Sequence, residues 1–381
     1  MKFNKWTLGL AAVGAVSLAS VASAEEAKMS QVQTALSNTT LSGVVDVGYS
    51  QQLGDVRNSH DHFTRNSATF YTPSYGIGNY ADGFSLNQVI ISLDKPLEAD
   101  KAWSAGYHVD LNWGDAAVNF NDSPIRQAYV ALNTPVGNGI NWKIGVFDGV
   151  TGYEGNTLSA NPNYSRSYGW QVNPATFTGI IGSYQIIDAI GVQAGYVNRD
   201  ESFSSLGASD NRRQAHSYIL TASFTAPESF GFLKGSALNL QTVQGFDNES
   251  VDNYSASLTL ATPVAGLKFG FAYDYVQSLA ESSDGAIYGM YATYQATDKL
   301  GFALRGEYIT AQDLGDQFDN WVYKNGEEVT ATISYNLWEN VLTRVEFRWD
   351  HSENDTAYYF GRGGDGYHNA FLVAANVAYK F

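Results

Sequence analysis

Apolar and polar residues alternate along much of this chain, which is the pattern of β-strands with two unlike faces. Residues 102–114 give the clearest case, and their apolar positions are Trp103, Ala105, Tyr107, Val109, Leu111 and Trp113. The two tryptophans lie about 33 Å apart along a strand, which at a tilt near 40° spans roughly 25 Å of height. This matches the apolar band of a membrane barrel with an aromatic residue at each water interface.

Other segments repeat this pattern and keep their charged residues on one side. In residues 267–276 the polar side carries Lys268 and Asp274, and in residues 341–350 it carries Arg344, Glu346, Arg348 and Asp350. A soluble β-sandwich would alternate as well, but aromatic residues at both ends of its strands would be unexpected. The charged face is therefore expected to meet water, and the apolar face is expected to meet lipid.

Short turns and longer polar connections also alternate, so the strands can be counted. The short turns are expected at 94–101, 134–139, near 188, 226–231, 262–266, 297–299 and 336–340. The longer connections are expected at 54–83, 115–124, 148–174, 200–212, 246–252, 279–284, 312–326 and 351–367. Together they predict an all-β fold, a transmembrane antiparallel up-and-down barrel of about 16 strands with short periplasmic turns and long extracellular loops.

The start of the chain has the pattern of a secretory signal. Lys2 and Lys5 precede an uncharged apolar run over residues 6–21, and Ala22 and Ala24 provide the small residues of a cleavage site. The run is shorter than the roughly 20 residues of a membrane anchor. We expect a cleaved signal peptide at 1–24, a periplasmic lead-in at 25–40 and the barrel at 41–381.

The carboxy-terminal segment alternates strictly. Its apolar set is Phe371, Val373, Ala375, Val377, Tyr379 and Phe381. This pattern is typical of the closing strand of barrels in the outer membrane of Gram-negative bacteria, and Phe381 is the predicted signal for the barrel assembly machinery.

Composition supports the same class. Aromatic residues make up 14% of the chain and there are 37 glycines, which suits twisted strands. Cysteine is absent, although disulfides would be permitted after export, so closed hydrogen bonding is expected to hold the fold. The formal net charge of −16 argues against a nucleic-acid partner.

Several segments resemble the OmpL-like β-barrel porin family, most strongly over residues 84–182. The resemblance lies in 84–89 (Phe-Ser-Leu-Asn-Gln-Val), 93–97 (Leu-Asp-Lys-Pro-Leu), 103–107 (Trp-Ser-Ala-Gly-Tyr), 126–130 (Arg-Gln-Ala-Tyr-Val), 145–147 (Gly-Val-Phe), 152–154 (Gly-Tyr-Glu) and 163–167 (Asn-Tyr-Ser-Arg-Ser). One departure is Phe177, where the family often has His. The resemblance implies a porin without defining its solute.

Residues that suggest enzymatic chemistry have plainer interpretations. His60 and His62 lie in a polar loop without a convincing third metal ligand. His108 and Asp110 could form half of a hydrolytic triad, but no nucleophile is placed beside them. No enzyme, metal or cofactor is expected. Acidic loop residues could bridge divalent cations to lipopolysaccharide, although a soluble rim is the favoured interpretation.

A barrel of about 16 strands is wide enough for an aqueous channel. An inward-folded loop usually narrows such a channel, and the candidate is 148–174 with Asp148, Tyr153, Glu154 and Arg166; the alternative is 54–83. The candidate pore-lining residues are Arg126, Lys143, Arg305, Glu307, Arg344, Glu346 and Arg348. The candidate interface aromatics are Trp103, Trp113, Trp349 and Tyr379.

Opposite charges across the lumen would create a transverse field that orients solutes and weights ions. The alternative is that these charges only pair with one another inside the barrel. The predicted function is passive diffusion of small hydrophilic solutes and ions. A non-conducting structural or adhesive barrel and an outer-membrane hydrolase are the competing functions. Expected partners are outer-membrane lipid and lipopolysaccharide, with a homotrimer suggested by analogy with general porins.

Overall fold

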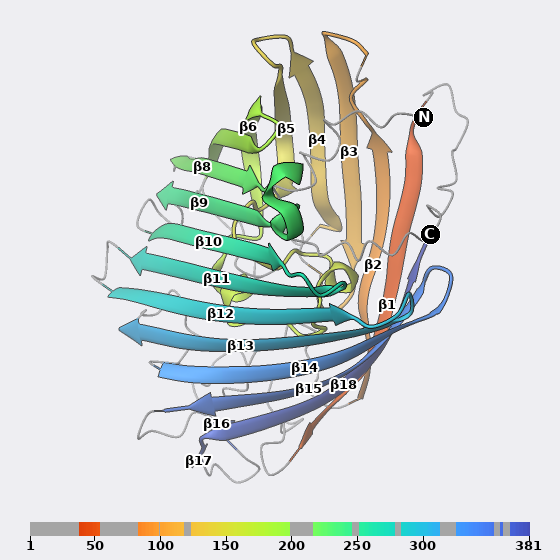
Figure 1. Ribbon diagram of the computed structural model, residues 1–381, viewed down its shortest axis with the longest axis vertical. Coiled ribbons are helices and arrows are strands. Elements are labelled where there is room, and N and C mark those ends of the chain that lie inside the picture. The colour runs from red at the N-terminus through yellow and green to blue at the C-terminus, as the bar shows by residue number, and fades with distance from the viewer. Residues whose placement is uncertain are drawn as a thin grey trace.

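Sixteen antiparallel strands form a closed barrel in the computed structural model (Figure 1). The structure describes residues 38–53, 83–98, 100–117, 123–198, 216–245, 251–278, 283–312, 325–353, 359–360 and 366–381. The predicted signal peptide and most of the predicted lead-in lie outside these residues, as do His60 and His62. Within the described residues, the prediction of about 16 strands is confirmed.

Most barrel strands pair with their neighbours in sequence, as in an up-and-down meander. The barrel strands are β1 Thr40–Leu53, β2 Gly83–Lys95, β3 Ser104–Trp113, β4 Ile125–Thr134, β5 Ile140–Asp148, β6 Thr176–Ile187, β7 Ile190–Asn198, β8 His216–Thr225, β9 Ala237–Gly245, β10 Val251–Ala261, β11 Leu267–Ser278, β12 Ser283–Gln295, β13 Leu300–Gln312, β14 Asn325–Trp338, β15 Val341–Ser352 and β18 Asn369–Lys380. Closure matters because every backbone N–H and C=O in a lipid environment needs a partner within the protein.

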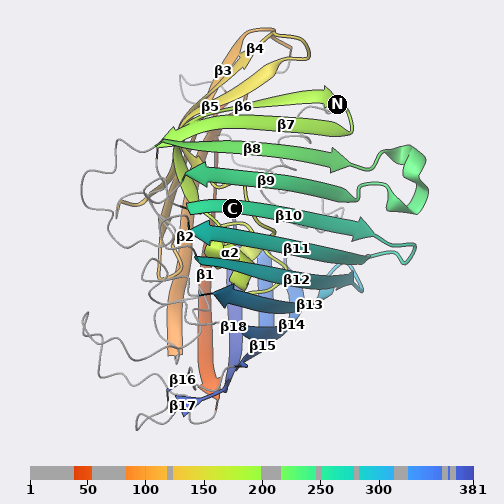
Figure 2. The ribbon, with the colours of Figure 1, turned by 90° about the vertical axis from the view of Figure 1, so that its left-hand side faces the viewer.

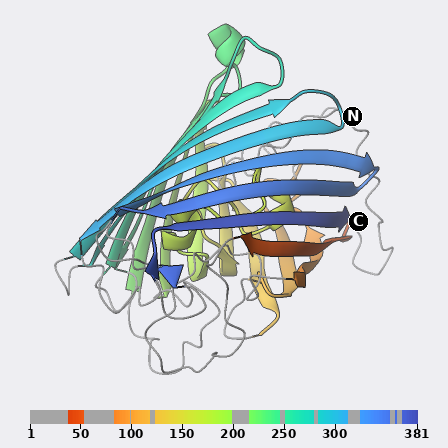
Figure 3. The ribbon, with the colours of Figure 1, turned by 90° about the horizontal axis from the view of Figure 1, so that it is seen from below.

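The barrel closes where β18 pairs with β1, which lie side by side in Figure 3. Val44 is opposite Lys380 in this seam. Next to that pair, Gly43 N donates to Phe381 O at 2.8 Å and Phe381 N donates to Gly43 O at 3.0 Å. The predicted closing strand therefore completes the sheet, and Phe381 takes part in its last hydrogen bonds.

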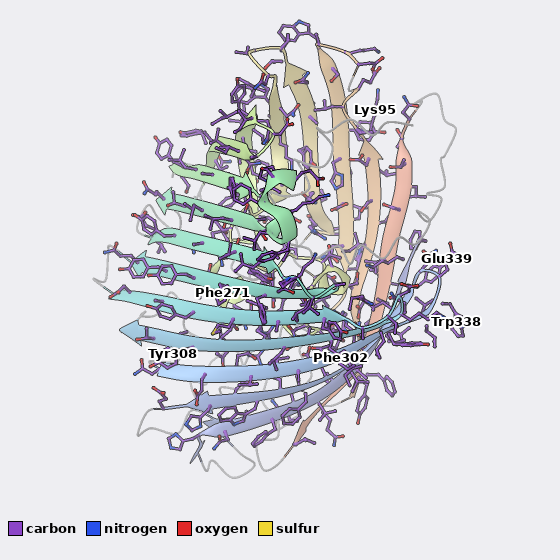
Figure 4. The ribbon with its side chains drawn as sticks, viewed as in Figure 1. Lys95, Phe271, Phe302, Tyr308, Trp338 and Glu339 are labelled. Carbon is purple, nitrogen blue, oxygen red and sulfur yellow. The ribbon has the colours of Figure 1, made fainter. Side chains whose placement is uncertain are left out.

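Side chains alternate between an apolar outer face and an inner face that is largely polar, apart from a band of buried apolar residues, among them Ile219 and Val243, that packs with Val172 of the β5–β6 connection. On β15, Val345 and Phe347 are exposed outward, while Glu346 is buried on the inside. Figure 4 shows the side chains along the wall and labels Phe271 on β11. On the outside of the described wall, the large exposed residues are mainly aliphatic or aromatic. This is the distribution expected of a barrel surrounded by lipid.

The four predicted interface aromatics lie at or near strand ends. Trp103 and Trp113 bracket β3 and are exposed, as is Tyr379 near the end of β18. Trp349 is half-buried, and its indole N–H donates to Asn369 Oδ1 at 2.9 Å. Their role as interface anchors stays a prediction.

Two connections differ from the sequence expectation. The connection between β8 and β9, predicted as a short turn at 226–231, contains the 3-10 helix η3 Glu228–Leu233 and projects beyond the strands in Figure 2. In the connection predicted at 351–367, β16 Tyr359–Phe360 and β17 Gly366–Tyr367 form a separate two-stranded sheet. Alternation cannot detect either element because both are too short to show a period. Among the described residues, no helix is long and apolar enough to cross a membrane.

The assignment of faces predicts that a new positive charge will cost more on the lipid-facing wall than in an exposed turn. Val345→Arg places a charge on the lipid-facing side near mid-strand and should lower the free energy of unfolding by about 2–4 kcal/mol. The control Glu339→Arg, in the β14–β15 turn labelled in Figure 4, should change it by only about 0–1 kcal/mol. Denaturant titration in lipid vesicles measures both values, and equal losses would contradict the assignment.

Candidate functional site: a loop held inside the barrel

The connection between β5 and β6 folds into the barrel, and we call residues 149–175 the inner loop. It contains η1 Leu158–Ala160 and the helix α2 Tyr168–Val172. In Figure 2, α2 lies within the barrel, and it contacts β11 and β12. Most of the inner loop is buried, so its backbone polar groups need partners other than bulk water.

Three arginines from the barrel wall satisfy backbone carbonyls of the inner loop. Arg344 Nη1 donates to the carbonyl oxygens of Leu158 and Asn161, each at 3.1 Å. Arg305 Nη1 donates to Ser165 O at 2.8 Å, and Arg348 Nη1 donates to Arg166 O at 2.6 Å. Hydrogen bonds from a charged donor are about twice as strong as neutral ones, so these contacts fix the path of the loop.

Carboxylates of the wall accept the N–H groups of the same segment. Glu346 accepts from Tyr164 N at 2.5 Å and from Ser165 N at 2.8 Å. Glu307 accepts from the first backbone N–H groups of α2, those of Tyr168 at 2.6 Å and Gly169 at 3.1 Å. The amino end of a helix leaves such groups without internal partners and favours negative charge, so Glu307 stabilises α2 where it begins.

The same charged side chains neutralise one another. Arg305 lies between two carboxylates, with Nη1 2.7 Å from Glu154 Oε1 and Nε 2.6 Å from Glu328 Oε1. Arg348 Nη2 lies 2.7 Å from Asp350 Oδ1. All five groups are fully buried. Removing one partner of such a buried pair costs about 3–5 kcal/mol, because the other charge is left without compensation.

Two tyrosines of the inner loop reach the wall at glycines. A Cβ on Gly270 of β11 would lie 2.1 Å from the hydroxyl of Tyr153, and one on Gly48 of β1 would lie 1.9 Å from that of Tyr164. Tyr153 also stacks on Tyr291 with ring centroids 4.0 Å apart. Only glycine allows these rings to approach the wall so closely.

Arg166 is buried within the inner loop and joins residues 155–156 to Trp170. Its guanidinium donates to the carbonyl oxygens of Gly155 and Asn156 and lies 3.9 Å from the centre of the Trp170 ring. Burial lowers the pKa of Arg166 to about 9, while the carboxylate of Glu154 acts in the opposite direction. Burial likewise raises the pKa of Tyr153 to about 12. Arg166 and Tyr153 both belong to the inner loop and not to a membrane-spanning strand.

A second polar cluster lies on β2 to β5, away from the arginines and glutamates of β13 and β15 in the strand order. The ring nitrogens of His108 each face a carboxylate, with Nδ1 2.9 Å from Asp94 and Nε2 2.9 Å from Asp110. The ring stacks on Tyr129, and Lys143 Nζ lies 4.9 Å from the centre of the same tyrosine ring. With both nitrogens engaged, His108 has no free position from which to activate a nucleophile.

The seven candidate pore-lining residues fall into two environments. Arg305, Glu307, Arg344, Glu346 and Arg348 are almost completely buried beneath the inner loop, and Arg126 is buried in an ion pair with Asp148. Lys143 is the one member of this set that is half-buried and not fully buried. Of the four loop candidates, Tyr153, Glu154 and Arg166 are buried, while Asp148 at the end of β5 is partly exposed.

Sequence reasoning missed several residues that hold the loop. Gln88 accepts from Leu158 N at 2.9 Å and donates to Asn156 O at 2.9 Å, and Asp274 accepts from Asn173 Nδ2 at 2.7 Å. Gly48 and Gly270 were also missed. The alternation of apolar and polar residues does place these residues on the inner face of the barrel. It does not show that they contact a loop, because a contact between residues far apart in sequence produces no periodic pattern.

A closed barrel of this size with a polar inside and an inward-folded loop defines the porin class of outer-membrane proteins. Residues 38–381 match the sequence profile of the family described as "Putative beta-barrel porin-2, OmpL-like". The chain belongs to this family, as its resemblance over residues 84–182 predicted.

Solved structures show the same fold at low sequence identity. The outer-membrane channel DcaP of Acinetobacter baumannii is 12% identical with a TM-score of 0.56, covering 90% of this chain and 97% of that one. An anion-selective porin from Comamonas acidovorans is 11% identical with a TM-score of 0.54, covering 90% and 99%. The trimer form of OmpT of Vibrio cholerae is 12% identical with a TM-score of 0.54, also covering 90% and 99%. Among curated protein sequences, none matches this chain significantly.

The contacts of Glu346 predict a local effect on the inner loop. Glu346→Gln replaces a charged double acceptor by a neutral amide, so the amide hydrogens of Tyr164 and Ser165 should exchange about tenfold faster or more. Hydrogen exchange of peptides covering residues 158–170 measures this change. Glu339→Gln in the exposed β14–β15 turn is the control and should leave exchange unchanged.

The glycine at position 270 predicts a steric effect on the same loop. Gly270→Val should displace the Tyr153 ring and separate it from Tyr291, because the added carbons would occupy its position. Fluorescence or protease sensitivity of the loop reports the displacement. Gly306→Val on β13 is the matched control, since the nearest atom to a Cβ there lies 3.8 Å away. Similar sensitivity in both variants would contradict the proposed contact.

Proposed function

We propose that this protein is an outer-membrane porin that lets small hydrophilic solutes and ions diffuse passively through a water-filled channel. The observation that carries the proposal is a 16-strand barrel whose inner wall is polar and whose β5–β6 connection folds inside. Barrels of about 16 strands are wide enough to leave an aqueous path, whereas about eight strands would fill with side chains.

The inner loop is the proposed narrowing element, in keeping with the candidate segment 148–174. Its anchors extend over β9 to β15, β18, β1 and β2, and they include Gly152 N donating to Gln241 and Ser255 at 3.1 Å.

On β7 and β8 the loop packs through apolar contacts, since Val197 and Ile219 are fully buried in one cluster with Val172. The wall over β3 to β5 instead keeps the inward residues His108, Tyr129 and Lys143 partly exposed. We therefore place the permeation path on that side of the barrel.

Lys143 is the proposed main contributor to ion preference among the seven candidate residues. It is partly exposed on the inner face of β5, over the ring of Tyr129 and near the carboxylates of Asp148, Asp110 and Asp94. The arginines and glutamates of β13 and β15 are proposed to act mainly through the loop that they hold. A low-dielectric wall focuses the field of a charge that borders the path more strongly than that of a charge paired in the interior.

The remaining assignments are proposals on the same basis. Export would remove residues 1–24, with 25–40 as a periplasmic lead-in and Phe381 as the assembly signal. Trp103, Trp113, Trp349 and Tyr379 would anchor the barrel at the two interfaces. A homotrimer is supported by the trimer form of OmpT of Vibrio cholerae, which shares this fold. No catalysis is proposed, and the doubly engaged ring of His108 supports that choice.

Planar-bilayer recording of the refolded full barrel tests the function directly. Stepwise conductance increments in KCl are expected, and their absence at protein levels that insert into the bilayer would favour a structural or adhesive barrel. Deletion of residues 156–165 from the inner loop should raise the single-channel conductance if this loop narrows the path.

The role of Lys143 predicts a change in ion preference. Lys143→Glu reverses the one candidate charge with appreciable exposure, so the reversal potential in a salt gradient should move toward cation selectivity. Lys299→Glu in the exposed turn after β12 is a control with the same change in charge. A reversal potential that moves equally in both variants, or in neither, would remove Lys143 from the permeation path.

A further inference from the structure

Three inward lysines lie near the end of the barrel that carries the short turns. Lys143 is the fourth residue of β5, Lys268 is the second of β11 and Lys380 is the last of β18. In the closed strand order, the steps between them are six, five and five strands. They are therefore spread almost evenly around this end of the barrel, and we call them the lysine ring.

Contacts of the inner loop show that two members of the ring point inward. Lys380 Nζ donates to Ser159 O of the loop at 3.3 Å. Lys268 lies two residues from Gly270, which the Tyr153 hydroxyl of the loop approaches from inside. Side chains two residues apart on a strand share a face, so Lys268 also points inward.

Lys143 leans along the inner wall toward the neighbouring strand. Its Nζ lies 4.9 Å from the centre of the Tyr129 ring. Gly145 of β5 is directly opposite Tyr129 and has no side chain, which leaves room for the lysine over the ring. The third ammonium group therefore also stays on the inner face.

Water reaches the wall at the level of the ring. Lys143 and Lys268 are half-buried, and Lys380 is exposed. Other inward residues near the turn ends, among them Ser183 of β6 and Thr293 of β12, also keep part of their surface exposed. This layer is therefore accessible from the turn end, unlike the buried apolar band that packs with the inner loop.

The members of the ring have no acidic partner. Within the described residues, none of the three lysines forms an ion pair. Asp94, a partly exposed acid near Lys143, lies 2.9 Å from His108 Nδ1. Asp148, another such acid, pairs with Arg126. The open charges at this level are therefore the ammonium groups.

Other charged residues of the inner wall hold the inner loop instead. Arg344, the fourth residue of β15, is buried and donates to the carbonyl oxygens of Leu158 and Asn161. Glu346 is buried and accepts from N–H groups of the loop. The whole chain has a formal net charge of −16, so composition does not explain open positive charge at one end of the inner face.

The spacing of the ring decides how it acts on a solute. Members five or six strands apart lie roughly 24–29 Å apart along the wall, at about 4.8 Å between strands. No single small solute can bridge them, so the three charges act through their summed field, which the low-dielectric wall focuses into the opening. The attraction of a solute to this field grows with the number of its negative charges.

We propose that the lysine ring concentrates small multivalent anions, with their charge on carboxylate or phosphate groups, at the turn-side mouth of the channel and so favours their passage. This inference rests on the proposed porin function and adds the chemical class of its favoured solute. Lys143 is the member that borders the proposed permeation path, and Lys268 and Lys380 extend its field around the mouth.

The test uses the refolded full barrel in planar bilayers. Reversal potentials in gradients of potassium succinate and potassium succinamate compare anions of nearly the same size with two charges and one charge. The permeability of succinate relative to potassium is expected to exceed that of succinamate about threefold or more. Potassium phosphate above neutral pH supplies a divalent anion without carboxylates and should show the same preference.

Two triple variants locate the effect on the ring. The ring variant Lys143→Gln, Lys268→Gln and Lys380→Gln removes the open charges, so the preference for the divalent anion should disappear. The control removes three lysines from exposed turns at the same end of the barrel, with an identical change in net charge: Lys101→Gln, Lys234→Gln and Lys299→Gln.

Two further variants keep the test decisive if the ring variant folds poorly. Arginine at all three ring positions retains the charge and should retain the preference. The double variant Lys268→Gln with Lys380→Gln leaves Lys143 in place and should lower the preference without abolishing it, because the remaining charge still borders the path.

The outcomes separate the two levels of the proposal. A wild-type barrel that inserts but carries no KCl current overturns the porin function itself. A conducting barrel that passes succinate and succinamate equally, that favours only one of succinate and phosphate, or whose ring variant behaves as the control does, overturns the lysine ring and leaves the porin function standing. Loss of the preference for both divalent anions in the ring variant alone supports both levels.

Discussion

The structure depends on how the inner loop satisfies its backbone inside the barrel. A segment without regular hydrogen bonding is costly to bury, because every unpaired N–H or C=O loses its bonds to water. Here the wall supplies charged partners of both signs, with Arg344 and Arg348 on carbonyls and Glu307 and Glu346 on amides. The path of the loop and the shape of the lumen therefore both depend on the charged residues of the wall.

This arrangement divides the inner wall into two kinds of surface. The charged side chains of β13 to β15 pair with the loop and with one another, and they are almost completely buried. The wall over β3 to β5 stays freer of the loop and carries the charged cluster around His108. A count of inward-facing charges from sequence alone would treat both surfaces alike, although only the second keeps its charged side chains His108 and Lys143 partly exposed.

Much of the fold could be predicted from sequence, because alternation reports directly which face each residue occupies. The strand pattern around Val345 and Glu346, the number of strands and the closing segment at Phe381 all follow from it. The loop anchors could not be predicted. Alternation does not show whether Glu346 faces water or accepts from the backbone of Tyr164, because these residues lie 182 positions apart in sequence. The need for glycine at position 270 likewise follows only from the contact with the Tyr153 ring.

The order of contacts along the chain has a consequence for assembly. The inner loop belongs to the first half of the sequence, but its charged partners Arg305, Arg344 and Arg348 belong to the last third. The seam between Gly43 and Phe381 likewise joins the two extremes of the barrel. Contacts of such long sequence separation form late and slowly. We therefore expect docking of the loop and closure of the sheet to fall in the same final stage, which would leave an unfinished barrel open at its edge and without a loop across its interior.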